Sequence, residues 1–211
     1  MEPLMEAKER ILQKAHELFH RYGIRSVSMD EIASQMGMSK KTLYQHFADK
    51  DALVGEVFAA LLQHKRQDCM DLQQASENAV HEEFIGFDNM SEMLSSMHPS
   101  LLYDLEKYHP EVFTKFRSFI GDFVYRLVRT NLERGIAEGL YRPEIDVDVL
   151  ARFRVATITI SSNPDSFPNR KPNLAYVEEQ LLDLFLHGVA TAKGQELIRK
   201  YKDQRLKTEI K

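Results

Sequence analysis

A short run of basic and polar side chains has the chemistry needed to bind a nucleic acid. Lys40 and Lys41 stand next to each other, and Thr42 and Tyr44 follow them closely. A lysine ammonium donates hydrogen bonds to phosphates and to guanine edges, and the hydroxyls of threonine and tyrosine donate to phosphates. The run therefore indicates a surface that contacts the backbone and the base edges of DNA.

Two short helices joined by a tight turn would present these side chains. Ser28, with Glu31 three residues later, forms the capping-box pattern that starts a helix. A connection over residues 37–39 separates this helix from a second one, which Ser39 is placed to cap. In the second helix Leu43 and Phe47 lie four residues apart on the inward side. Such a pair is the helix-turn-helix layout, in which the second helix enters the major groove of DNA.

Longer helices are expected on both sides of this pair. Residues 6–22 place apolar side chains at the spacing of one helix face, and Gly23 follows as a helix stop. Asp49 is placed to cap a longer helix after the pair. The apolar residues are Ile11, Ala15, Leu18, Phe19 and Tyr22 before the pair, and Leu53, Val57, Phe58 and Leu61 after it.

Residues 28–53 closely resemble the DNA-binding domain of the TetR family of bacterial transcription regulators, and the detailed match covers about residues 8–58. The matching features are Leu18-Phe19, Tyr22-Gly23, Val27-Ser28, Ile32-Ala33, Gly37-Met38-Ser39, Thr42-Leu43-Tyr44, His46-Phe47, and Lys50 with Leu53. The combination is specific, whereas any one element alone is weak. The resemblance implies a three-helix DNA-binding domain followed by a helical ligand-binding and dimerisation domain.

The resemblance also implies which residues contact DNA. In chain order they are Ser28, Met29, Lys40, Lys41, Thr42, Tyr44, Gln45, His46 and Lys50. Lys50 stands where family members carry a basic residue that clamps a phosphate. Asp30 departs from the family pattern, because other members can carry a basic DNA-facing residue there. We expect its carboxylate to serve the N-terminus of the helix, where negative charge is favourable.

Charge is distributed unevenly along the 211 residues. The net charge of −4, from 28 Lys+Arg and 32 Asp+Glu, by itself argues against a nucleic-acid binder, because such proteins are usually basic. Residues 1–50 carry a net charge of +1, residues 51–192 carry −9, and residues 193–211 carry +4. An acidic body with a locally basic head is what a DNA-binding module on a larger partner-binding domain would show.

Composition favours an all-α fold in a reducing compartment. Leu, Ala and Met are together about twice as frequent as Val and Ile. The single Cys69 cannot form an intramolecular disulfide. The longest apolar run is far shorter than the roughly 20 residues of a membrane helix, and the N-terminus lacks a secretory core. We expect a cytoplasmic protein with no membrane partner, no metal and no cofactor.

Methionine and phenylalanine stripes in the C-terminal two-thirds suit a pocket for a small, largely apolar ligand, although the same spacing also makes an ordinary helical core. They lie on helices expected over residues 84–96 and 110–139. The pocket candidates are Met90, Met93, Met97, Phe116, Phe119, Phe123 and Asn131. Asn131 is polar on an apolar face, so it either anchors a ligand or satisfies a backbone carbonyl.

The resemblance further implies a homodimer, formed by the last two helices at about residues 146–161 and 174–192, the second of which could continue into the basic tail. The candidate interface residues are Phe153, Thr157, Val177, Leu181, Leu184, Phe185 and Gly188. Two-fold symmetry then presents two recognition helices to a pseudo-palindromic double-stranded DNA operator. A ligand that binds one spacing of the two heads better than another would act as the switch.

The sequence thus predicts a helix-turn-helix DNA-binding domain over residues 1–50 and a helical effector-binding and dimerisation domain over residues 51–211. The predicted function is a transcription regulator, a repressor released from its operator by an unknown small-molecule effector. An enzyme would need a reactive constellation, and no G-x-S-x-G, P-loop, H-E-x-x-H or paired-Cys motif occurs. A helix-turn-helix protein controlled by a partner protein stays open, and an enclosed apolar cavity would distinguish the two.

Overall fold

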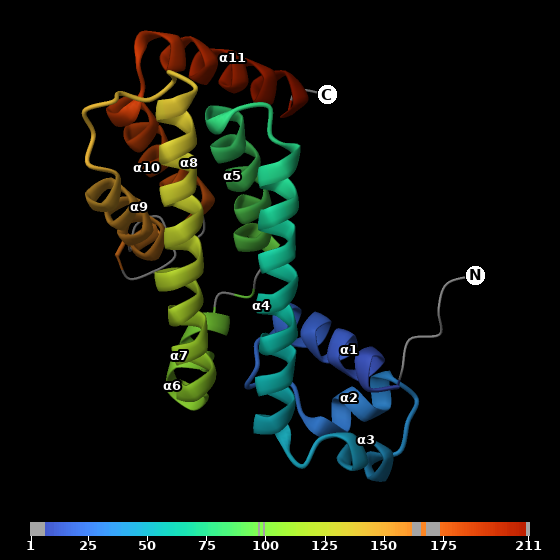
Figure 1. Ribbon diagram of the computed structural model, residues 1–211. Helices are drawn as coiled ribbons and strands as arrows, with labels where there is room; N and C mark the ends of the chain where they lie inside the picture. Colours follow the sequence, from blue (N-terminus) through green and yellow to red (C-terminus); the bar gives the residue numbers. More distant parts are fainter. Residues whose placement is uncertain (1–6, 97, 99, 162–165, 168–173, 210–211) are drawn as a thin grey trace. The chain divides into compact units, whose positions relative to one another are not determined.

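The computed structural model describes residues 7–96, 98, 100–161, 166–167 and 174–209 (Figure 1). Its α-helices are α1 (Ala7–Tyr22), α2 (Met29–Gln35), α3 (Lys40–His46), α4 (Lys50–Ala75), α5 (Ala79–Ser96), α6 (Leu101–Tyr108), α7 (Pro110–Ser118), α8 (Tyr125–Ala137), α9 (Val147–Ser161), α10 (Leu174–Val189) and α11 (Ala192–Glu209). A π-helical segment, η1 (Phe119–Val124), joins α7 to α8. The described residues contain no strand, so the predicted all-α fold is confirmed.

The chain divides into two compact units. The first unit consists of Met1–Arg66 and Ser96–Ser118, and the second consists of Gln67–Ser95 and Phe119–Lys211. Helix α4 supplies residues to both units, and α6 and α7 belong to the first although they follow α5 in the sequence. The predicted division after residue 50 concerns function, and it stays a prediction.

The first unit packs α1, α2, α3, α4 and α6 around one apolar core. Most of the positions expected from the helical spacing are buried in it, although Tyr22 is exposed and Leu61 is only partly buried. Helix α6 adds Leu101 and Leu105 to the same core. The buried residues of the two long helices are Ile11, Ala15, Leu18 and Phe19 on α1, and Leu53, Val54, Val57 and Phe58 on α4.

Three side-chain caps set the starts of α2, α3 and α4. The hydroxyls of Ser28 and Ser39 each accept a hydrogen bond from the backbone N–H three residues later, both at 3.1 Å. Asp49 Oδ1 accepts the equivalent bond for α4 at 2.8 Å. Each cap satisfies an N–H group that has no partner within the first helical turn. The helix starts predicted at these three residues are confirmed.

A buried hydrogen-bonded group lies in the core of the second unit. Asn131 Nδ2 donates to the carbonyl oxygen of Ala79 at 2.9 Å, and the Tyr141 hydroxyl lies 3.1 Å from Asn131 Oδ1. Gly135 makes room for the Tyr141 ring, because a Cβ atom at Gly135 would lie 2.0 Å from it. Burial raises the pKa of Tyr141 well above its usual range, so its hydroxyl keeps its proton and remains a donor.

A second buried polar group, the Arg154 cluster (Glu83, Arg154, Ser161 and Glu178), joins α5, α9 and α10. Arg154 Nη1 lies 2.6 Å from Glu178 Oε1, and Arg154 Nε lies 3.6 Å from Glu83 Oε2. The Ser161 hydroxyl donates to Glu178 Oε2 at 2.5 Å. Burial raises the pKa of Glu83, and Arg154 opposes that rise. The cluster carries a net negative charge when both carboxylates are ionised.

Two stretches that the sequence pattern favours as continuous helices are interrupted. The stretch after Pro110 contains η1 between α7 and α8. The predicted final helix corresponds to α10, which ends at Val189. A separate helix, α11, begins at Ala192, so α10 does not continue into the basic tail. An isolated β-bridge between Tyr141 and Ala190 lies at this break. No helix in the described part of the chain is both long and apolar enough to cross a membrane.

Candidate nucleic-acid interface

The turn between α2 and α3 fixes the angle between the two short helices. Gly37 has a φ of +63°, in the left-handed region that favours glycine. The N–H of Met38 donates to the carbonyl of Ala33 at 3.0 Å, and the N–H of Gly37 donates to the carbonyl of Ser34 at 3.1 Å. These two bonds are the Schellman arrangement that closes a helix. Helix α3 therefore starts directly after a rigid turn, as in a helix-turn-helix.

Helix α3 separates its apolar and polar residues onto different sides. Leu43 and Phe47, at its middle and end, are buried in the first core. The polar residues predicted to contact DNA remain outside: Lys40, Lys41, Tyr44, Gln45 and His46 are exposed, and Thr42 is half-buried. The Thr42 hydroxyl lies 2.8 Å from the Ser39 hydroxyl. The helix thus offers one continuous surface of donors and acceptors, at the edge of the first unit (Figure 1).

The two candidate residues at the start of α2 have different environments. Ser28 is exposed, and its hydroxyl already caps α2 while one hydroxyl hydrogen remains available to donate. Met29 is 6% exposed and packs in the first core. Its thioether therefore lies away from the surface that carries the α3 side chains, and only its backbone is placed to approach DNA.

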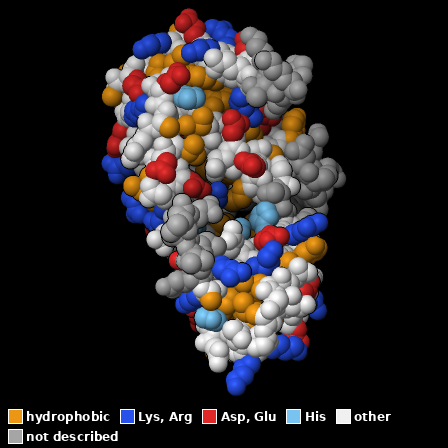
Figure 2. All heavy atoms as spheres, turned by 90° about the vertical axis from the view of Figure 1, so that its right-hand side faces the viewer, with side chains coloured by type: hydrophobic (Ala, Val, Ile, Leu, Met, Phe, Trp, Pro, Cys, Tyr) orange, Lys and Arg blue, Asp and Glu red, His pale blue; other side chains and the backbone are white. Residues whose placement is uncertain are grey.

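The departure at Asp30 has a specific partner in the structure. Asp30 Oδ2 accepts a hydrogen bond from Lys40 Nζ, so an acidic group of α2 is paired with the first basic group of α3. Lys41, by contrast, has no ion-pair partner among the described residues. Figure 2 shows one face of the molecule, on which basic and acidic side chains lie next to one another. Lys41 is consequently the more available of the two lysines.

Lys50 begins α4 and lies half-buried beside two carboxylates. Burial lowers the pKa of Lys50, and the charges of Asp104 and Asp51 oppose this change. Asp51 Oδ1 also lies 3.1 Å from His109 Nδ1, which follows α6. The start of α4 and the end of α6 therefore lie close together. An ammonium at this position can contact a phosphate without leaving the protein surface.

Asp104 positions the turn before α2, a role that the sequence analysis did not find. Its buried carboxylate accepts hydrogen bonds from the backbone N–H of Arg25 and from the Ser100 hydroxyl, both at 3.2 Å. A Cβ atom at Gly23, whose φ is +79°, would lie 2.7 Å from the Ser100 hydroxyl oxygen. The start of α6 is thus packed directly on the α1–α2 turn. No local spacing signals this contact, because it joins segments far apart in the sequence.

The pocket candidates do not gather in one unit. Phe116 belongs to the first unit, whereas Met90, Met93, Phe119 and Phe123 belong to the second. The Phe119 and Phe123 rings are buried with centroids 5.1 Å apart, and the two methionines are half-buried on α5. Met97 lies outside the described residues. Asn131 satisfies the Ala79 carbonyl, the structural of the two roles considered for it.

The dimer candidates on α9 and α10 divide into exposed and covered residues. Leu184 and Phe153 are 65% and 46% exposed, and Gly188 is also exposed. Leu181 is half-buried. The covered candidates are Thr157, Val177 and Phe185, which are buried within the chain itself. Three further apolar residues of these helices are exposed: Val149, Ile160 and Tyr176.

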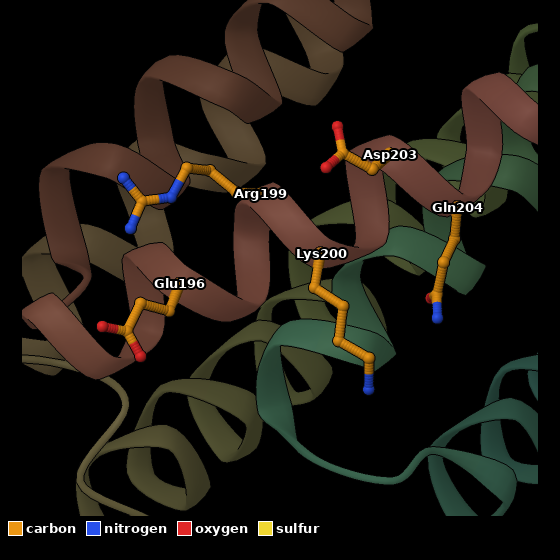
Figure 3. A pocket seen from close by; sticks show the side chains of 5 residues that line it. All are labelled: Glu196, Arg199, Lys200, Asp203 and Gln204. Carbon is orange, nitrogen blue, oxygen red and sulfur yellow. The ribbon is translucent and has the colours of Figure 1, made fainter.

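The basic C-terminal helix carries a shallow hollow on its outer side (Figure 3). Its lining side chains all come from α11 and mix both signs of charge: Glu196, Arg199, Lys200, Asp203 and Gln204. Other cations of the tail pair with acidic residues of the second unit, since Arg205 Nε lies 2.8 Å from Asp88 Oδ1 and Lys202 pairs with Asp183. Among the side chains of the tail that the structure describes, basic residues are thus interspersed with acidic ones or paired with them.

The N-terminal region matches one protein family. Residues 11–57 match the family model described as bacterial regulatory proteins of the tetR family. The chain is 25% identical to the HTH-type transcriptional repressor KstR2 of Mycolicibacterium smegmatis over 208 residues. This alignment covers 90% of this chain and 93% of that protein. The matched residues contain α2, the turn, α3 and the start of α4.

Solved structures share the fold over nearly the whole chain. A transcriptional regulator from Cytophaga hutchinsonii aligns with a TM-score of 0.71 and 21% identity, covering 87% of this chain and 98% of that one. The transcriptional regulator FadR of Bacillus subtilis, solved in complex with stearoyl-CoA, aligns with a TM-score of 0.63 and 17% identity, covering 84% and 96%. These similar proteins are transcriptional regulators and not enzymes.

Proposed function

We propose that this chain, whose residues 11–57 match the model of the tetR family of bacterial regulatory proteins, acts as a regulator of that kind and represses transcription by occupying a pseudo-palindromic operator. A small, largely apolar effector bound in the second unit would release it. The observation that carries the DNA-binding part is α3, whose apolar residues are buried while its basic and polar residues are exposed on one surface. Such a helix can enter a major groove without uncovering the core.

Sequence-specific contacts would come from α3, and positioning contacts from the residues around it. Lys41, Tyr44 and Gln45 have free donors for base edges and phosphates. Ser28 and Lys50, at the starts of α2 and α4, would hold phosphates on either side. Because α3 has a rigid turn before it and the core beneath it, its backbone is positioned before DNA arrives, which reduces the entropic cost of binding.

Two observations support the proposal that an apolar effector binds in the second unit. The second unit buries the aromatic pair Phe119 and Phe123, with half-buried methionines on α5 in the same unit, and adaptable apolar side chains of this kind line ligand sites. A regulator of similar fold was solved with stearoyl-CoA. An effector acts as a switch only if it binds the released form better than the DNA-bound form.

A homodimer is proposed through α9 and α10. Exposed apolar side chains gather on these two helices, with Val149, Phe153 and Ile160 on α9 and Leu184 on α10. A contiguous exposed apolar face marks an interaction surface. An isologous dimer would pair each face with its own copy and would match the two-fold symmetry of a palindromic operator.

The experiment begins with selection of a binding duplex from a random library with the wild-type chain, followed by fluorescence anisotropy at fixed salt. We expect Lys41→Ala to weaken binding of the selected duplex by ~1–3 kcal/mol, which is about five- to 150-fold. Lys200→Ala, which removes an exposed lysine from α11, is the matched control and should bind as the wild type does. Unchanged affinity of Lys41→Ala, with an unchanged circular dichroism spectrum, would reject α3 as the reading helix.

A second arm of the same experiment tests release. Stearoyl-CoA and its free pantetheine-containing headgroup, coenzyme A, are titrated into the preformed complex. An apolar effector site predicts that the acylated compound lowers the anisotropy and that coenzyme A alone does not. Release by both compounds, or persistence of the complex in a wider panel of apolar probes, would contradict an apolar effector while leaving the DNA contacts standing.

A further inference from the structure

Two cations and two tyrosines form an exposed patch in the first unit, outside the helix-turn-helix. Arg25 lies in the turn between α1 and α2, and Lys107 lies near the end of α6. Tyr103 and Tyr108, also on α6, are 56% and 41% exposed. We name these four residues the α6 patch. They belong to one compact unit, so their mutual arrangement is part of the fold of that unit.

The cations of the α6 patch are held by the tyrosines. The guanidinium of Arg25 lies 5.6 Å from the centroid of the Tyr108 ring, and Lys107 Nζ lies 5.3 Å and 5.4 Å from the centroids of Tyr103 and Tyr108. Lys107 Nζ donates to the Tyr103 hydroxyl at 2.9 Å. Cation–π contacts and a hydrogen bond orient both positive groups, so little side-chain freedom remains to be lost when an anion binds.

Neither cation is neutralised within the protein. In the part of the chain that the structure describes, no carboxylate forms an ion pair with the side chain of Arg25 or Lys107. Asp104, which lies on the same helix as Lys107, is buried, and its carboxylate accepts from the Arg25 backbone N–H and the Ser100 hydroxyl instead. Several cations on the second unit behave differently, since Arg134, Arg154 and Arg205 each pair with acidic side chains.

The α6 patch continues the candidate DNA-binding surface. Arg25 precedes Ser28 by three residues, and three residues of chain span at most about 10 Å, a distance over which one DNA strand carries about three phosphates. On its other side, Asp104 raises the pKa of Lys50 against the effect of burial. His109, two residues after Lys107, contacts Asp51 in the first turn of α4. Arg25 thus lies close in the chain to Ser28, and the end of α6 lies against the first turn of α4, which begins at Lys50.

We propose that the α6 patch binds the phosphate backbone of DNA that flanks the segment read by α3, with Arg25 and Lys107 as the anion-binding groups. The inference rests on the proposed DNA-binding function. It extends that function to α6, which lies outside the helix-turn-helix. Phosphate is the occupant that the chemistry favours, because ammonium, guanidinium and phenol hydroxyl groups all donate to it. Continuity with Ser28 and Lys50 favours DNA over an acidic protein.

The test compares how steeply the binding constant falls with salt concentration. Each phosphate contact contributes about one unit to the slope of log K against log salt. The duplex selected with the wild-type chain is titrated at several salt concentrations with wild type and with the double variant Arg25→Gln/Lys107→Gln. The slope of log K against log salt should become less steep by about two per protomer. The preference for the selected duplex over a random duplex should stay unchanged, because phosphate contacts carry no base information.

Charge-conserving variants separate charge from structure. Arg25→Lys/Lys107→Arg should keep the wild-type slope, whereas loss of slope in this variant would mean that the patch acts by holding the turn. A double Gln variant with the wild-type slope would overturn the proposal. These outcomes differ from failure of the proposed function itself, in which the wild type selects no duplex or Lys41→Ala retains full affinity.

Discussion

The ammonium of Lys40 has a competitor for DNA within the protein. Its partner Asp30 stands on the first turn of α2, where a carboxylate also stabilises the helix N-terminus. Both side chains are more than half exposed, so the pair contributes at most about 1 kcal/mol and is screened by salt. DNA can therefore displace Asp30, but at a cost that Lys41 does not bear.

We expect Asp30→Asn to increase DNA affinity at low salt. Releasing Lys40 from the pair should return up to ~1 kcal/mol to binding, which corresponds to about a fivefold rise in affinity. Anisotropy titration with the selected duplex measures the effect. Glu31→Gln, which removes a carboxylate from the same turn without touching Lys40, is the control. If the gain from Asp30→Asn persists in a Lys40→Ala background, the pair is not its cause.

Single residues also show where sequence is informative. The caps at Ser28 and Ser39 could be predicted because a cap depends on residues within one helical turn. The burial of Met29 could not, because residue type and family position do not say which way the side chain packs. Asp104 was missed for the same reason, since its contact with the backbone of Arg25 depends on tertiary packing of α6.

Among the helices, the phenylalanine series shows the limit of periodicity. Phe113 and Phe116 contact each other in the first unit, and Phe119 and Phe123 contact each other in the second. The spacing predicted one face of one helix, but η1 adds a wider turn between α7 and α8. A π-helical turn shifts the phase of the residues that follow it, and no composition signal marks it. The break before α11 similarly depends on tertiary contacts of Ala190 and Thr191.

The Arg154 cluster, which ties α5 to α9 and α10, makes a pH-dependent contribution to stability. Burial raises the pKa of Glu83 above its ordinary 4.5, so the folded chain holds this proton at a pH where the unfolded chain has released it. The free energy of unfolding from this group therefore falls as pH rises from about 4.5 through the folded-state pKa. Arg154 also pairs with Glu178, through a different nitrogen from the one that faces Glu83.

Glu83→Gln should remove that dependence. We expect the variant to be more stable than the wild type near neutral pH by on the order of 1 kcal/mol, because one fewer buried charge is left without full compensation, and the difference should shrink toward pH 4. Urea unfolding at several pH values measures it. Glu196→Gln, an exposed change on α11, should leave the wild-type profile unaltered. A wild-type pH slope that survives in Glu83→Gln would contradict this assignment.

At the scale of the whole molecule, the net charge of −4 does not show how unevenly the charges are distributed along the chain. Residues 51–192 carry −9, and many of their cations are paired with carboxylates. Unpaired cations such as Arg25, Lys41 and Lys107 belong to the first unit. The body should therefore repel phosphates, while the first unit attracts them and sets the orientation of approach. The match of the N-terminal region to the tetR family model could be predicted from sequence because the motif is local and specific, and the all-α class could be predicted from composition and helical spacing.

The apolar face on α9 and α10 predicts the oligomeric state. We expect light scattering at micromolar concentration to give twice the mass of one chain. Leu184→Glu/Phe153→Glu should give a monomer, because four charges would be buried in each isologous interface.

The control is Met70→Glu, a charge placed on an exposed apolar residue of α4, which should remain dimeric. Unchanged mass in Leu184→Glu/Phe153→Glu would move the interface elsewhere. Monomeric Met70→Glu would show that added charge alone disrupts association.

Because α4 is long, a small tilt of this helix moves its end by a large distance. Its 26 residues, at 1.5 Å per residue, form a rod of about 39 Å that begins at Lys50. A tilt of about 5° about one end moves the other end by about 3.4 Å, which equals the rise of one base pair. A tilt of a few degrees about the Ala75 end is therefore enough to shift Lys50 by about one base pair. A small tilt of α4 can thus change the fit of the protein to the DNA groove without any change in the residues that contact DNA.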